Sequence, residues 1–246
     1  GGDRPTLALA GKGITFDTGG VSLKRGDGMW MMKGDMTGAA VVSSTVLAAA
    51  RRGAQANVVA LAALAENMPS GTAIRPGDVL TSMSGKTIEI DSTDAEGRLV
   101  LSDAVYYAHA EYKPDLLIDV ATLTGSVGRA VGPDYAGVFS LQDEIADGLL
   151  EAGAATGEEM WRLPLNDTYF EQIKSEIADV KNGGAGGAGA SVGAAFIGSF
   201  IGDDQPWAHI DIAGVDYNEE AVPTTPKGFT GWGVRMLDEY LRRHYE

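Results

Sequence analysis

Three short segments combine carboxylates with lysine or arginine at spacings that could bind metal ions. They are GKGITFDTGG at 11–20, GMWMMKGDMTGAA at 28–40 and DSTDAEGRL at 91–99. Grouped carboxylates repel one another and raise each other's pKa unless a counter-charge lies among them. A hard divalent cation is such a counter-charge and prefers oxygen ligands. The segments therefore predict a site for two ions, with the carboxylates of Asp17, Asp35, Asp94 and Glu96 as candidate ligands.

The second and third segments also have an ordinary structural interpretation. Asp35 precedes a helical pattern rich in small residues, where its carboxylate could cap the first turn. Thr93 and Glu96 fit the S/T-x-x-E capping box, and Asp91 could be a turn residue. Each pattern taken alone favours the structural role, whereas the three together favour metal binding.

The elements that must position these segments follow from the alternation of apolar runs and helical patterns. Strands are predicted at 6–10, 57–65, 115–121, 135–140 and 208–213, and helices at 38–52, 99–112, 143–154, 190–201 and 230–243. A hairpin is predicted within 74–91 from its Pro-Gly and Ser-Gly turns. The alternation favours an α/β sandwich with a largely parallel core. Lys12 and Asp17 are expected in the loop beyond the first strand, at the edge where ligands bind in such sheets.

Composition narrows the chemistry. Nineteen Lys and Arg residues against 34 Asp and Glu residues give a formal net charge of -15, which disfavours nucleic acids and anionic membranes. The chain has no cysteine and three histidines, so a metal site must use mainly oxygen ligands. The sequence contains no uninterrupted apolar stretch of about 18 residues, so it predicts no membrane-spanning helix. A cytoplasmic location is expected.

Two glycine-rich stretches were considered as nucleotide sites. Gly13 follows Lys12 where a Walker loop has Ser or Thr, so the first stretch does not fit. The second, NGGAGGAGA at 182–190, contains a literal G-x-G-x-x-G, but no clear strand precedes it. A flexible loop near a substrate channel is the favoured interpretation of this second stretch.

Long ordered motifs across nearly the whole chain resemble the leucyl aminopeptidases of the family called M17. They are GKGITFDTGG, MMKGDMTGAA, ENMPSGTAIRPGDVLTSMSGKTIEI, STDAEGRLVLSDA, DVATLTG, WAHIDIAG and KGFTGWGVRML. The resemblance implies a three-layer α/β/α sandwich around a mixed, mostly parallel sheet, as in zinc exopeptidases. It also implies a metal-dependent exopeptidase that hydrolyses the N-terminal peptide bond of peptides through a metal-bridging hydroxide.

The resemblance assigns roles to individual residues by motif. One divalent ion would lie among Lys12, Asp17, Asp35 and Glu96, and the other among Asp17, Asp94 and Glu96, with the Asp94 carbonyl contributing. Lys12 would be a neutral ligand, since a nearby dication lowers the pKa of an amine. Lys24 would stabilise the oxyanion, and Arg98 would hold a bicarbonate that relays the proton. The expected ions are Zn²⁺ or Mn²⁺, with Mg²⁺ or Co²⁺ as alternatives.

The same resemblance suggests a pocket for the first side chain of the peptide, suited to leucine-like residues. Its expected lining is Met32, Thr122, Leu123 and Gly125. Sequence alone slightly favours plain core packing for Met32 and Leu123. His109 and His209 are expected to pack or to support ligands rather than bind metal.

The chain departs from the commonest family spelling at Thr18, Ser92 and Ser126, which affects no proposed ligand. It is interpreted as one catalytic domain over 1–246, without the N-terminal domain that usually precedes it in the family. A homohexamer is expected from the resemblance. Two other classes stay open: a non-catalytic scaffold, since relatives can bind DNA, and a nucleotide-binding enzyme.

Overall fold

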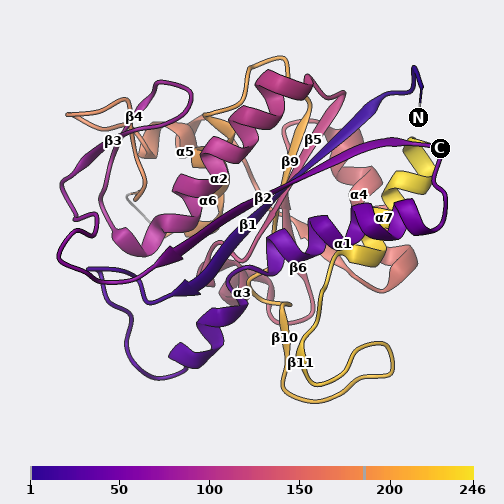
Figure 1. The fold of residues 1–246 in the computed structure, drawn as a ribbon, viewed down its shortest axis with the longest axis horizontal. Helices are drawn as coiled ribbons and strands as arrows, with labels where there is room; N and C mark the ends of the chain where they lie inside the picture. Colours follow the sequence, from indigo (N-terminus) through magenta and orange to yellow (C-terminus); the bar gives the residue numbers. More distant parts are fainter. Residues whose placement is uncertain (1, 185–186) are drawn as a thin grey trace.

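A computed structural model describes residues 2–184 and 187–246. Its centre is a six-stranded sheet with the order β2-β1-β5-β9-β6-β7 (Figure 1). The four strands β2, β1, β5 and β9 are parallel, β6 is antiparallel to β9, and β7 is parallel to β6. The strands are β1 Thr6–Asp17, β2 Asn57–Asn67, β5 Leu116–Ala121, β6 Ala136–Phe139, β7 Met160–Arg162 and β9 Trp207–Asp211.

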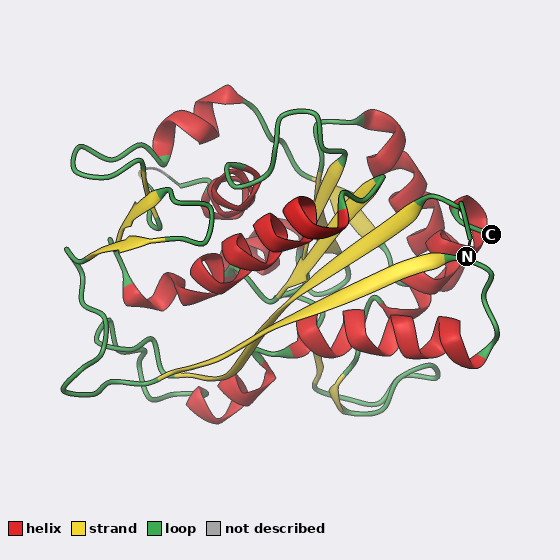
Figure 2. Ribbon diagram, turned by 45° about the horizontal axis from the view of Figure 1, so that its top comes forward, coloured by secondary structure: helices red, strands yellow, loops and turns green. Residues whose placement is uncertain are grey.

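Helices cover both faces of this sheet (Figure 2). One face packs against α1 Thr37–Arg51, α4 Asp143–Thr156 and α7 Val234–His244. The other packs against α2 Glu96–Tyr107, α3 Gly125–Val131 and α6 Gly189–Gly198, with α5 Asp167–Gln172 beside α6. This arrangement confirms the predicted three-layer α/β/α fold with a mixed, mostly parallel sheet.

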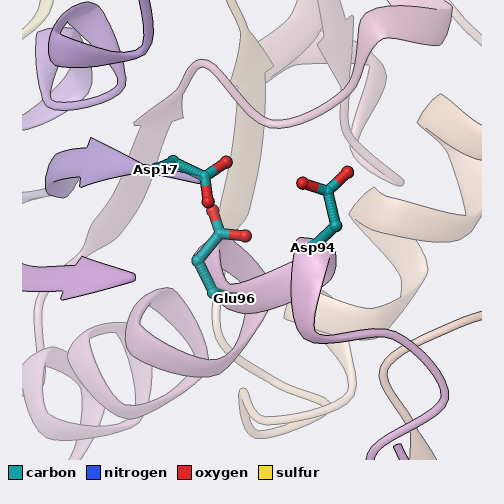
Figure 3. Close-up of side chains that lie close together, drawn as sticks. All are labelled: Asp17, Asp94 and Glu96. Atoms are coloured by element: carbon teal, nitrogen blue, oxygen red, sulfur yellow. The ribbon is translucent and has the colours of Figure 1, made fainter. Parts of the chain in front are cut away.

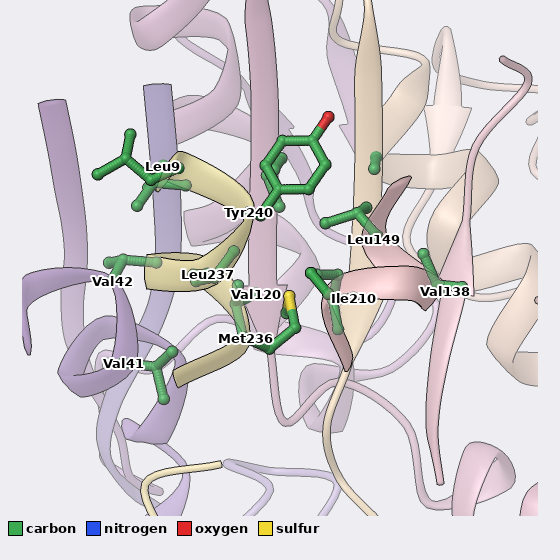
Figure 4. Packing of buried hydrophobic residues seen from close by; sticks show 14 of the residues in the cluster. Leu9, Val41, Val42, Val120, Val138, Leu149, Ile210, Met236, Leu237 and Tyr240 are labelled. Atoms are coloured by element: carbon green, nitrogen blue, oxygen red, sulfur yellow. The ribbon is translucent and has the colours of Figure 1, made fainter. Parts of the chain in front are cut away.

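The alternation of side chains along each strand explains the two cores. Leu7 and Leu9 of β1 face the α1/α7 layer, whereas Ala8 and Ala10 face α2. Figure 4 shows Leu9 beside Val42, Leu237 and Tyr240 in the first of these cores. Since both faces of the central strands are buried, their sequences are nearly continuous apolar runs.

The predicted elements agree with the structure except at the first strand. β1 continues to Asp17, because it pairs with β2 from Thr6 through Asp17 and so extends beyond its last pair with β5, Gly11 with Val120. Lys12 and Asp17 therefore lie within a strand, and their expected placement in a loop was wrong. The length of a strand is set by its hydrogen bonds to neighbouring strands, and the apolar run predicted only where β1 begins.

Shorter elements complete the fold. A small sheet contains β3 Val79–Thr81, β4 Thr87–Glu89 and β8 Val180–Lys181, in which β3 and β4 form the predicted hairpin. The remaining elements are the hairpin strands β10 Tyr217–Asn218 and β11 Gly228–Phe229, the 3-10 helices η1 Met29–Gly34 and η2 Thr93–Ala95, and the π-helical turn η3 Ala108–Tyr112. Across 2–184 and 187–246, no helix is both long and apolar enough to span a bilayer.

Candidate active site

A cavity of about 370 Å³ lies where the parallel strands end. Residues from β1, η1, the start of α2 and the segments after β5 and β9 line it. Six charged residues that were predicted from the sequence as site residues line this cavity: Lys12, Asp17, Lys24, Asp35, Asp94 and Glu96. The cavity therefore brings together segments as far apart in the chain as Lys12 and Asp216.

Lys12 is buried and makes three polar contacts. Its Nζ lies 2.7 Å from Asp35 Oδ1 and 3.1 Å from Glu96 Oε1, and it donates a hydrogen bond of 3.0 Å to the carbonyl oxygen of Thr122. Burial lowers the pKa of Lys12, but the attraction of Asp35 and Glu96 outweighs burial, so its pKa is raised. The two carboxylates thus favour the ammonium form of Lys12, and the neutral-ligand role that the resemblance implies would require a dication beside it.

Gly97 allows the side chain of Lys12 to lie across the first turn of α2. A Cβ atom at this position would be 2.3 Å from Lys12 Cε, closer than real contacts allow. Gly97 therefore leaves the space in which the Lys12 side chain lies, and so helps to position its ammonium group.

Lys24 forms the second cationic bridge of the cavity. Its Nζ lies 2.7 Å from Asp17 Oδ2 and also contacts Asp94 Oδ1. Burial lowers the pKa of Lys24, but its hydrogen bonds to Asp17 and Asp94 outweigh burial and raise it. Each of the two lysines thus forms ion pairs with two carboxylates, so two positive charges face four acidic groups.

Asp17, Asp94 and Glu96 form a group that could bind a metal ion. One carboxylate oxygen from each lies within 4.8 Å of the others. Figure 3 shows Asp17 at the end of β1, Asp94 in η2 and Glu96 at the start of α2. Asn67 supports the group, since its Nδ2 donates to Asp17 Oδ1 at 2.8 Å and to Glu96 Oε2 at 3.4 Å. This asparagine at the end of β2 was not singled out from the sequence.

Asp35 does not cap the helix that follows it. The N-cap of α1 is Met36, with no side-chain cap hydrogen bond, and Asp35 Oδ1 instead accepts from Lys12 and from Thr122 Oγ1 at 2.7 Å. Its Oδ2 is buried and has no partner among the described residues. Burial raises the pKa of Asp35 to about 7, because Lys12 offsets only part of the desolvation. An oxygen left without a partner in this position fits a metal ligand.

The predicted capping box at the start of α2 does not form either. Ala95 is the N-cap of α2, and Ser92 caps the preceding η2 through a hydrogen bond from Asp94 N. Thr93 Oγ1 donates to the Gly19 carbonyl oxygen and accepts from Ser22 N. Thr93 therefore joins the two carboxylate-bearing segments instead of capping a helix, and Glu96 stays free to face the cavity.

The predicted pocket residues Met32, Thr122, Leu123 and Gly125 all line the cavity. Asp211, at the end of β9, fixes their segment by accepting hydrogen bonds from Leu123 N and Thr124 N, both at 3.1 Å. This buried aspartate was not singled out from the sequence, although it lies within the predicted strand at 208–213.

Arg98 is deeply placed but is not part of the cavity lining. Its Nη1 donates to the Asn182 carbonyl oxygen at 2.6 Å, and its Nη2 lies 3.5 Å from the Gly189 carbonyl oxygen. Burial lowers the pKa of Arg98 to about 10, so it remains a cation at neutral pH. Asn182 precedes the glycine-rich stretch, of which 185–186 lie outside the described residues, so the flexible loop predicted there is only partly described.

The histidines lie away from the acidic group. His209 Nδ1 lies 2.5 Å from Asp119 Oδ1, and Trp207 Nε1 donates to Asp119 Oδ2 at 2.7 Å. All three residues belong to the neighbouring strands β5 and β9 and are buried. His109 Nδ1 pairs with Gln205 Oε1 at 3.0 Å. Both placements agree with a packing or supporting role, and the partner Asp119 was missed because a single aspartate within an apolar strand carries no pattern.

Asp216 also lines the cavity and was not identified from the sequence. It lies between β9 and β10, where the Thr230 N–H donates a 2.9 Å hydrogen bond to its carbonyl oxygen. Burial raises the pKa of its carboxyl group to about 6, with a further rise from Asp211 that Lys12 opposes. The cavity thus contains a fifth carboxylate, separate from the four that form ion pairs with the lysines.

Comparisons with known proteins agree with this arrangement. A model described as the catalytic domain of the cytosol aminopeptidase family matches residues 1–238. Proteins named probable cytosol aminopeptidase are similar to the chain: that of Rickettsia bellii is 50% identical over 99% of this chain, and that of Dinoroseobacter shibae is 51% identical over 100%. These matches cover 49% and 50% of the two relatives, so the chain spans about half their length.

Solved structures show the same fold. The bottromycin maturation enzyme BotP in complex with Mn has a TM-score of 0.92 and 40% identity, over 98% of this chain and 54% of that one. Leucyl aminopeptidase from Trypanosoma brucei in complex with bestatin has a TM-score of 0.89 and 37% identity, over 97% of this chain and 46% of that one. With the family model matching nearly all of its length, the chain belongs to the cytosol aminopeptidase family, as its motifs predicted.

Proposed function

We propose that this chain is the catalytic part of a metal-dependent aminopeptidase, which removes single residues from the free N-termini of peptides. The observation that carries the proposal is the cavity in which Lys12 and Lys24 meet four carboxylates at the ends of parallel strands. Family membership and the named relatives support the same activity.

The donor set fits two divalent ions. One would bind among Lys12, Asp17, Asp35 and Glu96, and the other among Asp17, Asp94 and Glu96 with the Asp94 carbonyl. The free Oδ2 of Asp35 and the close oxygens of the acidic group support this assignment. Oxygen-rich sites of this kind discriminate weakly among divalent ions, so Zn²⁺ and Mn²⁺ are both candidates, and Mg²⁺ or Co²⁺ could substitute. BotP, similar in fold, was solved with Mn.

Two such ions supply a water nucleophile of lowered pKa and polarise the scissile carbonyl. The lysines act around them. Lys24 is positioned by Asp17 and Asp94 to donate to the negative charge that develops on the substrate oxygen. Lys12 holds Asp35 and Glu96 in place and becomes a neutral ligand when a dication lies beside it.

Arg98 would hold a bicarbonate ion that relays the proton from the nucleophile to the leaving amine. Its guanidinium is cationic at neutral pH and anchored at Nη1 by the Asn182 carbonyl. A half-buried cation beside the cavity is suited to a small anion, because partial removal from water strengthens the attraction between them.

The apolar part of the cavity would receive the first side chain of the peptide. Met31, Met32 and Leu123 supply flexible, apolar surface, which favours leucine-like residues. Asp211 fixes the segment that carries Leu123, so this wall is held in position by buried hydrogen bonds.

Metal removal tests the proposal. Treating the protein with a chelator and dialysing it should abolish hydrolysis of leucine p-nitroanilide, and added Mn²⁺ or Zn²⁺ should restore it. Peptides with an acetylated N-terminus should not be cleaved, since the free amine is part of the recognition. Undiminished activity in protein shown to be metal-free by elemental analysis would overturn the proposal.

We also propose that the protein acts in the cytoplasm as a homohexamer. The names of its relatives support the location, and family membership supports the assembly. Light scattering on the active protein tests the assembly, and an active monomer would contradict it.

A further inference from the structure

One carboxylate of the cavity is left out of the ion pairs made by the others. Lys12 pairs with Asp35 and Glu96, and Lys24 pairs with Asp17 and Asp94. Asp216 lines the same cavity, yet in the described part of the chain no other residue donates a hydrogen bond to its carboxylate or pairs with it.

The backbone around Asp216 is held firmly. The Thr230 N–H donates to the Asp216 carbonyl oxygen at 2.9 Å, and Thr230 Oγ1 donates to the Val215 carbonyl oxygen, also at 2.9 Å. In the hairpin that follows, formed by β10 and β11 (Figure 1), Tyr217 pairs with Phe229. Asp216 is therefore the residue at which this hairpin joins the cavity wall.

The hairpin is also packed against η1, which carries Met31 and Met32. The Phe229 ring lies so close to Gly34 that a Cβ atom there would be 1.9 Å from Phe229 Cε1. Phe229 and Tyr217 stack edge to face with their centroids 5.3 Å apart. The same contacts that place the two methionines therefore place Asp216, so the carboxylate is preorganised beside an apolar surface.

A long side chain with a terminal cation matches such a wall. Its methylene groups can pack on the methionines and Leu123 while its charged end reaches a carboxylate. A neutral side chain of the same length leaves that carboxylate without a partner, which is costly for a group partly removed from water.

We propose that Asp216 is a specificity-determining residue that recognises a lysine or arginine side chain at the first position of the peptide. This inference rests on the proposed aminopeptidase function and extends its substrate class from leucine-like residues to basic ones. Asp216 selects among substrates and takes no part in bond cleavage.

The test compares lysine with norleucine, whose side chain has a similar length and no charge. The kcat/KM values for the two p-nitroanilides are measured at about pH 8, where carboxylates are ionised. The wild-type protein should favour lysine, and Asp216→Asn should lower the lysine-to-norleucine ratio about tenfold or more, as expected for a charged hydrogen bond. The norleucine value should change less than about twofold.

Glu219→Gln is the matched control, because Glu219 is an exposed acidic residue of the same hairpin loop. It removes the same charge and should leave the ratio unchanged. A wild-type preference for norleucine would overturn the inference. An equal loss for both substrates in Asp216→Asn would also overturn it, since Asp216 would then contact a part common to every peptide. An equal fall of the ratio in the control would show a general effect of net charge and would overturn it too.

A binding measurement separates this inference from the proposed function. Lysinamide and norleucinamide are titrated calorimetrically into the Mn²⁺-loaded wild-type protein and Asp216→Asn. If neither p-nitroanilide is cleaved, the proposed function fails. Tighter binding of lysinamide that is lost in Asp216→Asn would still support the role of Asp216, whereas equal binding of the two amides would refute it.

Discussion

Replacing Asp119, which does not line the cavity, should destabilise the protein strongly. Its carboxylate is fully buried and accepts from His209 Nδ1 at 2.5 Å and from Trp207 Nε1 at 2.7 Å. Asp119→Leu removes both acceptor oxygens at similar volume and leaves two buried donors unpaired. Hydrogen bonds to a charged group contribute about 1.5–3 kcal/mol each, and breaking a buried pair costs about 3–5 kcal/mol. We expect the free energy of unfolding to fall by about 3–5 kcal/mol.

Urea denaturation followed by circular dichroism measures this loss. Asp147→Leu is the control, since Asp147 is exposed on α4 and such surface substitutions change stability by about 0.5 kcal/mol or less. The double variant Asp119→Leu with His209→Phe removes one of the stranded donors. It should therefore be more stable than the sum of the two single losses predicts, by about 1 kcal/mol or more.

Two outcomes would refute this reasoning. One is an Asp119→Leu protein as stable as Asp147→Leu, which would mean that the buried contacts add nothing beyond packing. The other is strict additivity in the double variant, which would mean that Asp119 and His209 do not stabilise each other.

The remaining predictions concern the cavity. Lys12→Ala should lower the metal content at one site, whereas Lys24→Ala should keep both ions. The kcat of Lys24→Ala should fall by about 10²–10³, as expected when an oxyanion donor is removed. Metal analysis and kinetics test both variants, and metal loss in Lys24→Ala but not in Lys12→Ala would contradict the assignment. Gly97→Ala should displace the Lys12 side chain, whose Cε would lie 2.3 Å from the new Cβ, and so mimic the metal loss of Lys12→Ala; unchanged metal content would contradict this. Burial, together with the nearby Asp211 and against the opposing effect of Lys12, raises the pKa of Asp216 to about 6. The carboxylate therefore loses its charge as the pH falls below that value. The lysine-to-norleucine ratio should therefore fall between about pH 7 and pH 5 in the wild type and stay flat in Asp216→Asn.

The sequence by itself determined the layers of the fold and the acidic character of the site. Alternating apolar and helical patterns predicted the strands and helices, since each period follows from local backbone geometry. The motifs around Lys12, Asp17 and Glu96 predicted the family, which the family model confirms. These features are local, so one stretch of chain contains all the information they need.

Only the tertiary structure decided which atoms meet. The pairing with β2 extends β1 to Asp17, and this register brings Lys12 to Asp35 and Glu96. Its ion pair with Lys12 keeps the Asp35 side chain in the cavity, so Asp35 does not cap α1. No local pattern marks such contacts, because they depend on pairing between distant strands.

Asp119 and Asp216 show the same limit. An aspartate within an apolar strand and an aspartate after a strand are both ordinary in sequence. One becomes the buried partner of His209, and the other becomes a cavity carboxylate without a partner from another described residue. The difference arises from packing across the sheet and from the β10–β11 hairpin docking on η1, which long-range contacts alone determine.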